Sequence, residues 1–108
     1  MPVSIQISVR GVELPEKAKE RIQKHAEELG KLYPRMTSCK VVVESPTHRH
    51  KKGNLFYLRI TISMPRKELV VNREPSKRHS HEEIQVAIRD AFNEARRQLK
   101  DFVSKQRG

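Results

Sequence analysis

Four of the five histidines form two His-x-His pairs, and these are the side chains whose spacing most suggests metal binding. His48 and His50 lie in one polar segment, and His79 and His81 lie in or beside another. Four imidazoles can in principle hold a transition-metal ion. Each pair is surrounded by Lys and Arg, however, which repel a dication, and no carboxylate-rich shell lies nearby. We therefore expect no metal, and we expect these imidazoles to donate hydrogen bonds to phosphate, more strongly when protonated.

The chain offers little for covalent or acid–base catalysis. Cys39 is the single cysteine, so an internal disulfide and a Cys-based zinc site are excluded, and its place at a strand start is typical of a small buried residue. Asp90 and Asp101 both lie in the last helical segment and do not resemble a catalytic pair. The glycines are scattered and form no phosphate-binding loop. We expect a protein that is not an enzyme and that uses no cofactor and no small-molecule substrate.

The largest chemical signal is an excess of positive charge. The 108 residues include 23 Lys or Arg and 13 Asp or Glu, which gives a net charge of +10. Such an excess attracts polyanions, and phosphate contacts from Lys and Arg supply most of the sequence-independent affinity for nucleic acid. The composition therefore favours nucleic acid as the partner, ahead of an anionic membrane surface.

The cations are sorted to particular places along the chain. In residues 15–33 and again in residues 84–107, helical spacing puts basic and acidic side chains on different sides of one apolar stripe. The polar segments 45–54 and 73–80 carry further Lys and Arg. The candidate RNA-binding residues from these four regions are Lys17, Arg21, Lys24, Lys31, Arg49, Lys51, Lys52, Lys77, Arg78, Arg89, Arg96 and Lys100.

The hydrophobic pattern predicts the elements that must position these cations. Alternation of polar and apolar residues, or runs of β-branched residues, predict strands; apolar residues at three- and four-residue steps predict helices. The order is β-α-β-β-β-α, and a right-handed crossover makes the first two strands parallel. We expect one α+β domain over residues 1–108, a four-stranded mixed sheet with two helices on one face, similar to double-stranded-RNA-binding domains. The expected strands cover residues 3–10, 39–44, 55–64 and 67–73, and the second helix follows an S-x-x-E capping box at 80–83.

The sequence also bears on cellular location. No stretch approaches the roughly 20 apolar residues that span a bilayer, and the alternating N-terminus lacks the apolar block of a signal peptide. We expect a cytoplasmic protein that does not bind membranes.

Two stretches of sequence resemble a known family. The last helical segment reads Ala87-Ile88-Arg89-Asp90 and then Arg96-Arg97-Gln98-Leu99-Lys100, and residues 39–44 form a Val-rich strand that closes on Glu. In this element order, the chain resembles the ribosome hibernation promoting factor and ribosome-associated translation inhibitor family, which is sigma-54 modulation protein-like. The resemblance covers essentially the whole chain.

This resemblance implies a non-enzymatic protein that binds the small ribosomal subunit between head and body. There it would overlap the messenger- and transfer-RNA sites and keep the ribosome idle under stress, with basic residues contacting ribosomal RNA. By position, Arg97 and Lys100 match the family's basic residues, which adds Arg97 to the candidates, and Arg89 stands where the family usually has Asp. Longer family members carry a second domain that pairs ribosomes, and the sequence leaves open whether this chain is a short form or part of a longer protein.

Two alternatives remain open at this point. An α-β-β-β-α core also reads double-stranded RNA by shape, so the chain fits a general double-stranded-RNA-binding domain. The His-x-His loops leave a metal-binding protein as a less favoured alternative.

Overall fold

The computed structural model describes residues 3–11, 13–44, 57–73 and 84–107. The elements are β1 (Ser4–Arg10), α1 (Glu16–Leu32), β2 (Ser38–Glu44), β3 (Tyr57–Met64), β4 (Lys67–Arg73) and α2 (Ile84–Arg107). The predicted order β-α-β-β-β-α is therefore confirmed. The start expected for the third strand and the capping box at 80–83 lie outside the described residues.

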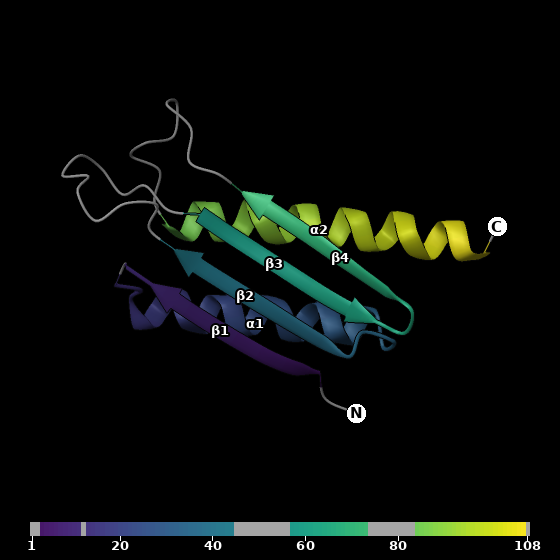
Figure 1. Cartoon of the computed structure of the whole chain (residues 1–108), viewed down its shortest axis with the longest axis horizontal. Coiled ribbons are helices and arrows are strands. Elements are labelled where there is room, and N and C mark those ends of the chain that lie inside the picture. Colours follow the sequence, from purple (N-terminus) through teal and green to yellow (C-terminus); the bar gives the residue numbers. More distant parts are fainter. Residues whose placement is uncertain (1–2, 12, 45–56, 74–83, 108) are drawn as a thin grey trace.

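The four strands form one mixed sheet in the order β1-β2-β3-β4 (Figure 1). β1 and β2 are parallel, with Ser4 opposite Ser38, whereas β3 is antiparallel to β2 and to β4. This is the predicted topology, in which α1 makes the crossover between parallel neighbours and the later strands follow as hairpins.

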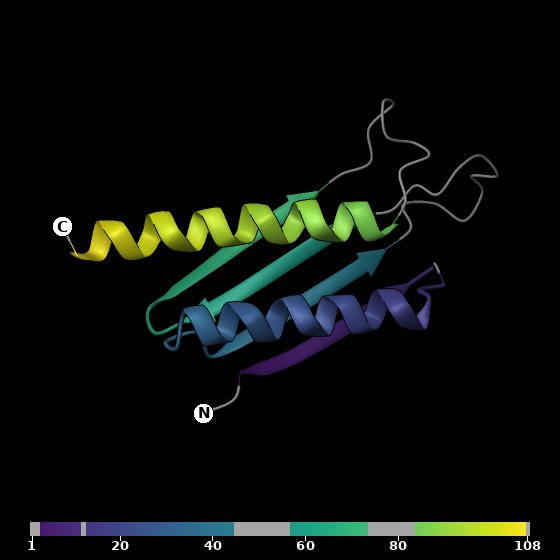
Figure 2. The same cartoon turned by 180° about the vertical axis from the view of Figure 1, so that it is seen from behind.

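Both helices cover the same face of the sheet and run side by side in the same direction (Figure 2). α1 packs over β1, and α2 packs over β3 and β4. Each helix buries one stripe at three- and four-residue steps, and each strand contributes alternate residues, because only one side of each element meets the other layer. The buried core includes Ala18, Ile22, Ala26, Leu29, Cys39, Val41, Val43, Leu58, Ile60, Ile62, Ala87, Ile88, Ala91, Phe92, Ala95 and Leu99.

The ends of α1 are fixed by backbone hydrogen bonds. The Pro15 carbonyl accepts hydrogen bonds from the N–H groups of Ala18 (2.9 Å) and Lys19 (3.1 Å), so the helix starts beside a residue that has no N–H of its own. At the other end the Tyr33 N–H donates to the Leu29 carbonyl at 2.9 Å. Pro34 follows directly and cannot continue the helix, which gives the chain a sharp turn toward β2.

Candidate nucleic-acid interface

The facing sides of the two helices meet at His25 and Phe92. The rings of His25 in α1 and Phe92 in α2 stack with centroids 5.0 Å apart and planes inclined by 15°. Arg21 and Lys24 of α1 and Arg96 of α2 all act electrostatically on His25, so cations from both helices surround one imidazole. The basic sides that the sequence assigned to each helix separately are therefore turned toward each other.

We call four cations the interhelical basic surface: Arg21, Lys24 and Arg96, which act on His25, and Lys100, which lies one helical turn after Arg96 on α2. All four side chains are exposed. Within the described part of the chain, none of them pairs with a carboxylate. Lys17 lies one helical turn before Arg21 and extends the same surface toward the start of α1. These guanidinium and ammonium groups are available to an external anion.

His25 lies at the base of the interhelical basic surface, with 24% of its side chain exposed. Burial lowers the pKa of this imidazole below its usual value of 6.5, and Arg21, Lys24 and Arg96 lower it further. Glu28, whose Oε1 lies 3.9 Å from His25 Nδ1, acts in the opposite direction. Helical spacing places Glu28 on the basic side of α1, so the separation of basic and acidic side chains on that helix is less complete than we expected from the sequence.

Arg97 of α2, unlike Arg96, is paired with carboxylates of its own helix. Arg97 Nε donates to Glu94 Oε1 at 3.0 Å, and Arg97 Nη1 donates to Asp101 Oδ2 at 3.3 Å. Hydrogen bonds from Arg97 and Gln98 lower the pKa of Glu94 to about 2. Arg97 is thus held between two carboxylates, about 100° around the helix from Arg96. This pairing distinguishes Arg97 from Lys100, with which the family resemblance grouped it.

Arg89 and Lys31 occupy the margins of the interface. Arg89 donates from Nε and Nη2 to Asp90 Oδ1, both at 3.2 Å, while Asp90 Oδ2 lies 3.7 Å from Arg73 of β4. Arg89 is therefore exposed but already engaged. Lys31 is exposed in the last turn of α1, near the opposite end of the helix pair.

The remaining candidates lie outside the described residues. These are the loop cations and both His-x-His pairs, and they stay predictions: Arg49, Lys51, Lys52, Lys77 and Arg78, with His48, His50, His79 and His81.

The described residues offer no second kind of chemistry. Cys39 is fully buried in β2, as its position predicted, and burial raises the pKa of its thiol to about 11, which disfavours the reactive thiolate. In the parts of the chain that the structure describes, no three His, Cys, Asp or Glu side chains gather as metal ligands. Over those same parts, neither helix has the apolar length needed to cross a bilayer.

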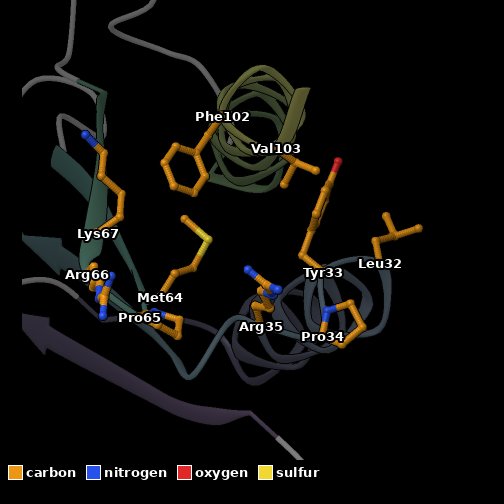
Figure 3. Close-up of a pocket in the computed structure, with 10 residues that line it drawn as sticks. All are labelled: Leu32, Tyr33, Pro34, Arg35, Met64, Pro65, Arg66, Lys67, Phe102 and Val103. Atoms are coloured by element: carbon orange, nitrogen blue, oxygen red, sulfur yellow. The ribbon is translucent and has the colours of Figure 1, made fainter. Parts of the chain in front are cut away.

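A second basic feature was missed by the sequence patterns. A hollow of about 1230 Å³ opens where the C-terminal ends of both helices meet the β3–β4 turn (Figure 3). Tyr33 and Phe102 line it from the two helices, and three cations that belong to no helical stripe surround it: Arg35, Arg66 and Lys67. The available signal was their position one or two residues after Pro34 and Pro65, which end a helix and a strand.

Comparison with protein families identifies the chain. The model of the family described as Sigma 54 modulation protein / S30EA ribosomal protein matches residues 5–107. The chain belongs to this family. The family suggested by the last helix is confirmed, and the members of this family are ribosome-associated factors.

Solved structures of low sequence identity share the fold. A ribosomal subunit interface protein from Coxiella burnetii superposes with a TM-score of 0.73 at 11% identity, over 94% of this chain and 99% of that one. The N-terminal domain of Protein Y from Thermus thermophilus gives a TM-score of 0.66 at 19% identity, again over 94% and 99%. No curated protein sequence matches the chain. At these identities the likeness supports the fold of Figure 1 and leaves the role of each residue to the geometry.

Proposed function

We propose that this protein is a non-enzymatic, cytoplasmic factor that binds the small ribosomal subunit near the messenger- and transfer-RNA channel. Its binding there inhibits translation and keeps ribosomes idle under stress. Membership of a ribosome-associated family supports the partner. The observation that carries the proposal is the interhelical basic surface, because it gathers cations from two helices that form no ion pair with a carboxylate of the described residues.

The physical basis of binding is the exchange of condensed counterions for protein cations. Each phosphate contact from Lys or Arg releases counterions from the RNA, so affinity falls with salt in proportion to the number of contacts. Arg21 and Arg96 each present a guanidinium, which binds phosphate in a bidentate geometry. The two parallel helices hold these groups on a rigid base, which lowers the entropic cost of ordering them on RNA.

The proposal is tested by cosedimentation with purified small ribosomal subunits across a salt series. The test variant replaces Arg21, Arg96 and Lys100 by Gln. Its matched control removes the same charge elsewhere, by replacing Lys19, Lys40 and Lys105 by Gln, all of which lie away from the interhelical basic surface. We expect the test variant to lose affinity and to flatten the salt slope by about three, whereas the control keeps the slope of the unmodified protein. Absence of binding at low salt, or equal losses in both variants, would contradict the proposal.

The alternative function is that of a general double-stranded-RNA-binding domain, because such a domain has the same order of elements as α1-β2-β3-β4-α2. The two functions differ in their preference for free duplex. We expect binding to small subunits at concentrations where a 20-base-pair duplex RNA does not compete. Full competition by the duplex would favour the general RNA-binding domain.

A further inference from the structure

We propose that the hollow at the C-terminal ends of α1 and α2 binds one unpaired RNA nucleotide, with its base against Tyr33 and Phe102 and its phosphate on the surrounding cations. This inference rests on the proposed function for its choice of RNA as ligand. It adds a site for a single base to a surface that otherwise contacts only phosphate.

The walls of the hollow are aromatic and come from different helices. Figure 3 shows Phe102 of α2 and Tyr33, just after α1, on two sides of the opening, with Met64 of β3 between them at its base. Tyr33 and Phe102 are partly buried against the core, so each ring keeps a surface that packs and a surface that remains accessible. Every nucleobase has a flat π-face, and stacking on aromatic side chains is how proteins hold single-stranded bases.

The backbone that carries Tyr33 is held on both sides. The Tyr33 N–H donates to the Leu29 carbonyl, and the Tyr33 carbonyl accepts from the Met36 N–H, both at 2.9 Å. Thr37 then attaches the segment to β3, since its N–H and its Oγ1 donate to the Ser63 carbonyl at 2.8 Å and 3.1 Å. A ring on a fixed backbone loses little freedom when a base stacks on it, which favours binding.

The charge around the opening selects for an anion. Arg35, Arg66 and Lys67 line the hollow, and none of its lining residues is acidic. Within the described residues, no carboxylate pairs with any of these three cations. Lys67 Nζ lies 6.0 Å from the centroid of the Phe102 ring, which joins the cationic rim to an aromatic wall. Aromatic walls with a cationic rim match the two halves of a nucleotide.

Arg66 occupies a backbone conformation that favours glycine. Its φ is 65°, and it is the second residue of the two-residue turn that joins Met64 to Lys67. Gly or Asn is preferred at such a position, because a side chain with a Cβ is strained there. Strained residues persist most often where the side chain has a function, and here the side chain is a cation at the hollow.

The hollow lies at the same end of the helix pair as two exposed cations of the proposed RNA-binding surface. Lys31 is in the last turn of α1, and Lys100 lies within one turn of Phe102 on α2. An RNA strand whose phosphates follow the helix pair toward its C-terminal ends therefore reaches the hollow beside the β3–β4 turn. An unpaired base at that end of the strand has the aromatic walls within reach.

Tyrosine fluorescence provides a direct test, since the chain has two tyrosines and no tryptophan. In the variant Tyr57→Phe, Tyr33 is the only fluorophore, and stacking of a base on its ring quenches it. The probes are a single-stranded oligouridylate of eight nucleotides and an abasic strand with the same number of phosphates. We expect at least twofold stronger quenching by the oligouridylate at equal occupancy of the protein, measured by anisotropy of end-labelled strands.

Two further variants separate stacking from charge. Phe102→Leu keeps an apolar wall but removes a ring, and Arg66→Gly removes a cation while relieving the strained backbone, so neither depends on a destabilised fold. We expect each variant to weaken oligouridylate binding about threefold or more. For Phe102→Leu, binding of the abasic strand should stay nearly unchanged, because that strand has no base to stack on the ring. Val70→Ala serves as the matched control, because Val70 is an exposed apolar residue of β4 that does not line the hollow.

The outcomes distinguish this inference from the proposed function. Equal quenching and equal affinity for the two strands would overturn the nucleotide site, even if small subunits still cosediment. Preferential binding of an acidic peptide that contains Phe, with no quenching by oligouridylate, would also overturn it in favour of a protein partner. Quenching by oligouridylate without cosedimentation would support the nucleotide site and contradict the ribosomal function.

Discussion

The two flanks of α2 carry arginines that are adjacent in sequence and opposite in use. Arg96 joins Arg21 and Lys24 around His25, and within the described residues Arg96 forms no ion pair with a carboxylate. Arg97 lies about 100° further around the helix and is held by Glu94 and Asp101. The same side chain is available to a polyanion on one flank and satisfied internally on the other. A count of basic residues therefore overstates the binding surface, because pairing decides which cations are free.

The largest effect is expected from a substitution that removes the contact between the two helices. Phe92→Ala removes a ring that is 4% exposed and stacks on His25. We expect the free energy of unfolding to fall by about 3–5 kcal/mol, because the truncation leaves a cavity as well as removing apolar contacts. Urea denaturation followed by circular dichroism measures this loss. The half-buried Phe102 provides the control. If Phe102→Ala lowered the free energy of unfolding as much as Phe92→Ala, the contact between the helices at Phe92 would contribute no more to stability than the packing of Phe102.

Two single substitutions that each remove one positive charge test the difference between Arg96 and Arg97. Arg96→Gln removes a free cation, and we expect it to weaken binding to small ribosomal subunits roughly tenfold and to reduce the salt slope by about one. Arg97→Gln removes a guanidinium that Glu94 and Asp101 already hold, so the slope stays unchanged. Cosedimentation at four or five salt concentrations measures both. Identical slopes for the two variants would show that only net charge matters and that the flanks are equivalent.

The smallest expected effect concerns the pH dependence of the interhelical basic surface. Groups around His25 are Arg21, Lys24 and Glu28 from α1 and Arg96 with Phe92 from α2. A phosphate bound there favours the imidazolium, so RNA binding raises a pKa that is lowered in the free protein, and affinity increases as pH falls. Between pH 7.5 and 6.0 we expect the affinity of the unmodified protein to increase roughly threefold more than that of His25→Phe. This variant is the control, because it keeps a stacked ring but cannot titrate.

The same imidazole sets the sign of a stability change in the free protein. Because its folded-state pKa is below the usual 6.5, the unfolded chain binds more protons near that pH. The contribution of His25 to the free energy of unfolding is therefore at its maximum above pH 6.5, and it decreases as the pH falls through that value. Denaturation midpoints of the unmodified protein and His25→Phe, compared at pH 7.5 and 5.5, measure it. A larger pH-dependent loss in His25→Phe would contradict this assignment.

The elements and their buried faces could be predicted from local patterns. Alternation over β1 and β3 and the stripe Ala18, Ile22, Ala26 and Leu29 in α1 are properties of the backbone period, which is independent of the rest of the chain. The pairing of Arg97 was also within reach, since Glu94 and Asp101 lie three residues before it and four residues after it. The family resemblance grouped Arg97 with Lys100 by position in the motif, and the motif does not take account of the carboxylates that pair with Arg97.

The hollow and the meeting of His25 with Phe92 could not be predicted in this way. Tyr33, Arg66 and Phe102 belong to three separate elements, and no periodic pattern links them. Their proximity depends on where the ends of α1, α2 and the β3–β4 turn come together.

The sequence by itself determined the fold order, the apolar face of each element and the sorting of charge around each helix, because all three follow from spacing along a single backbone. Only the tertiary structure decided which flank of α2 faces α1. That choice depends on the placement of α1 over β1 and of α2 over β3 and β4, which packing of the two layers fixes. This placement turns two separate basic stripes into one surface, whereas the pairing of Arg97 with Glu94 and Asp101 is internal to α2.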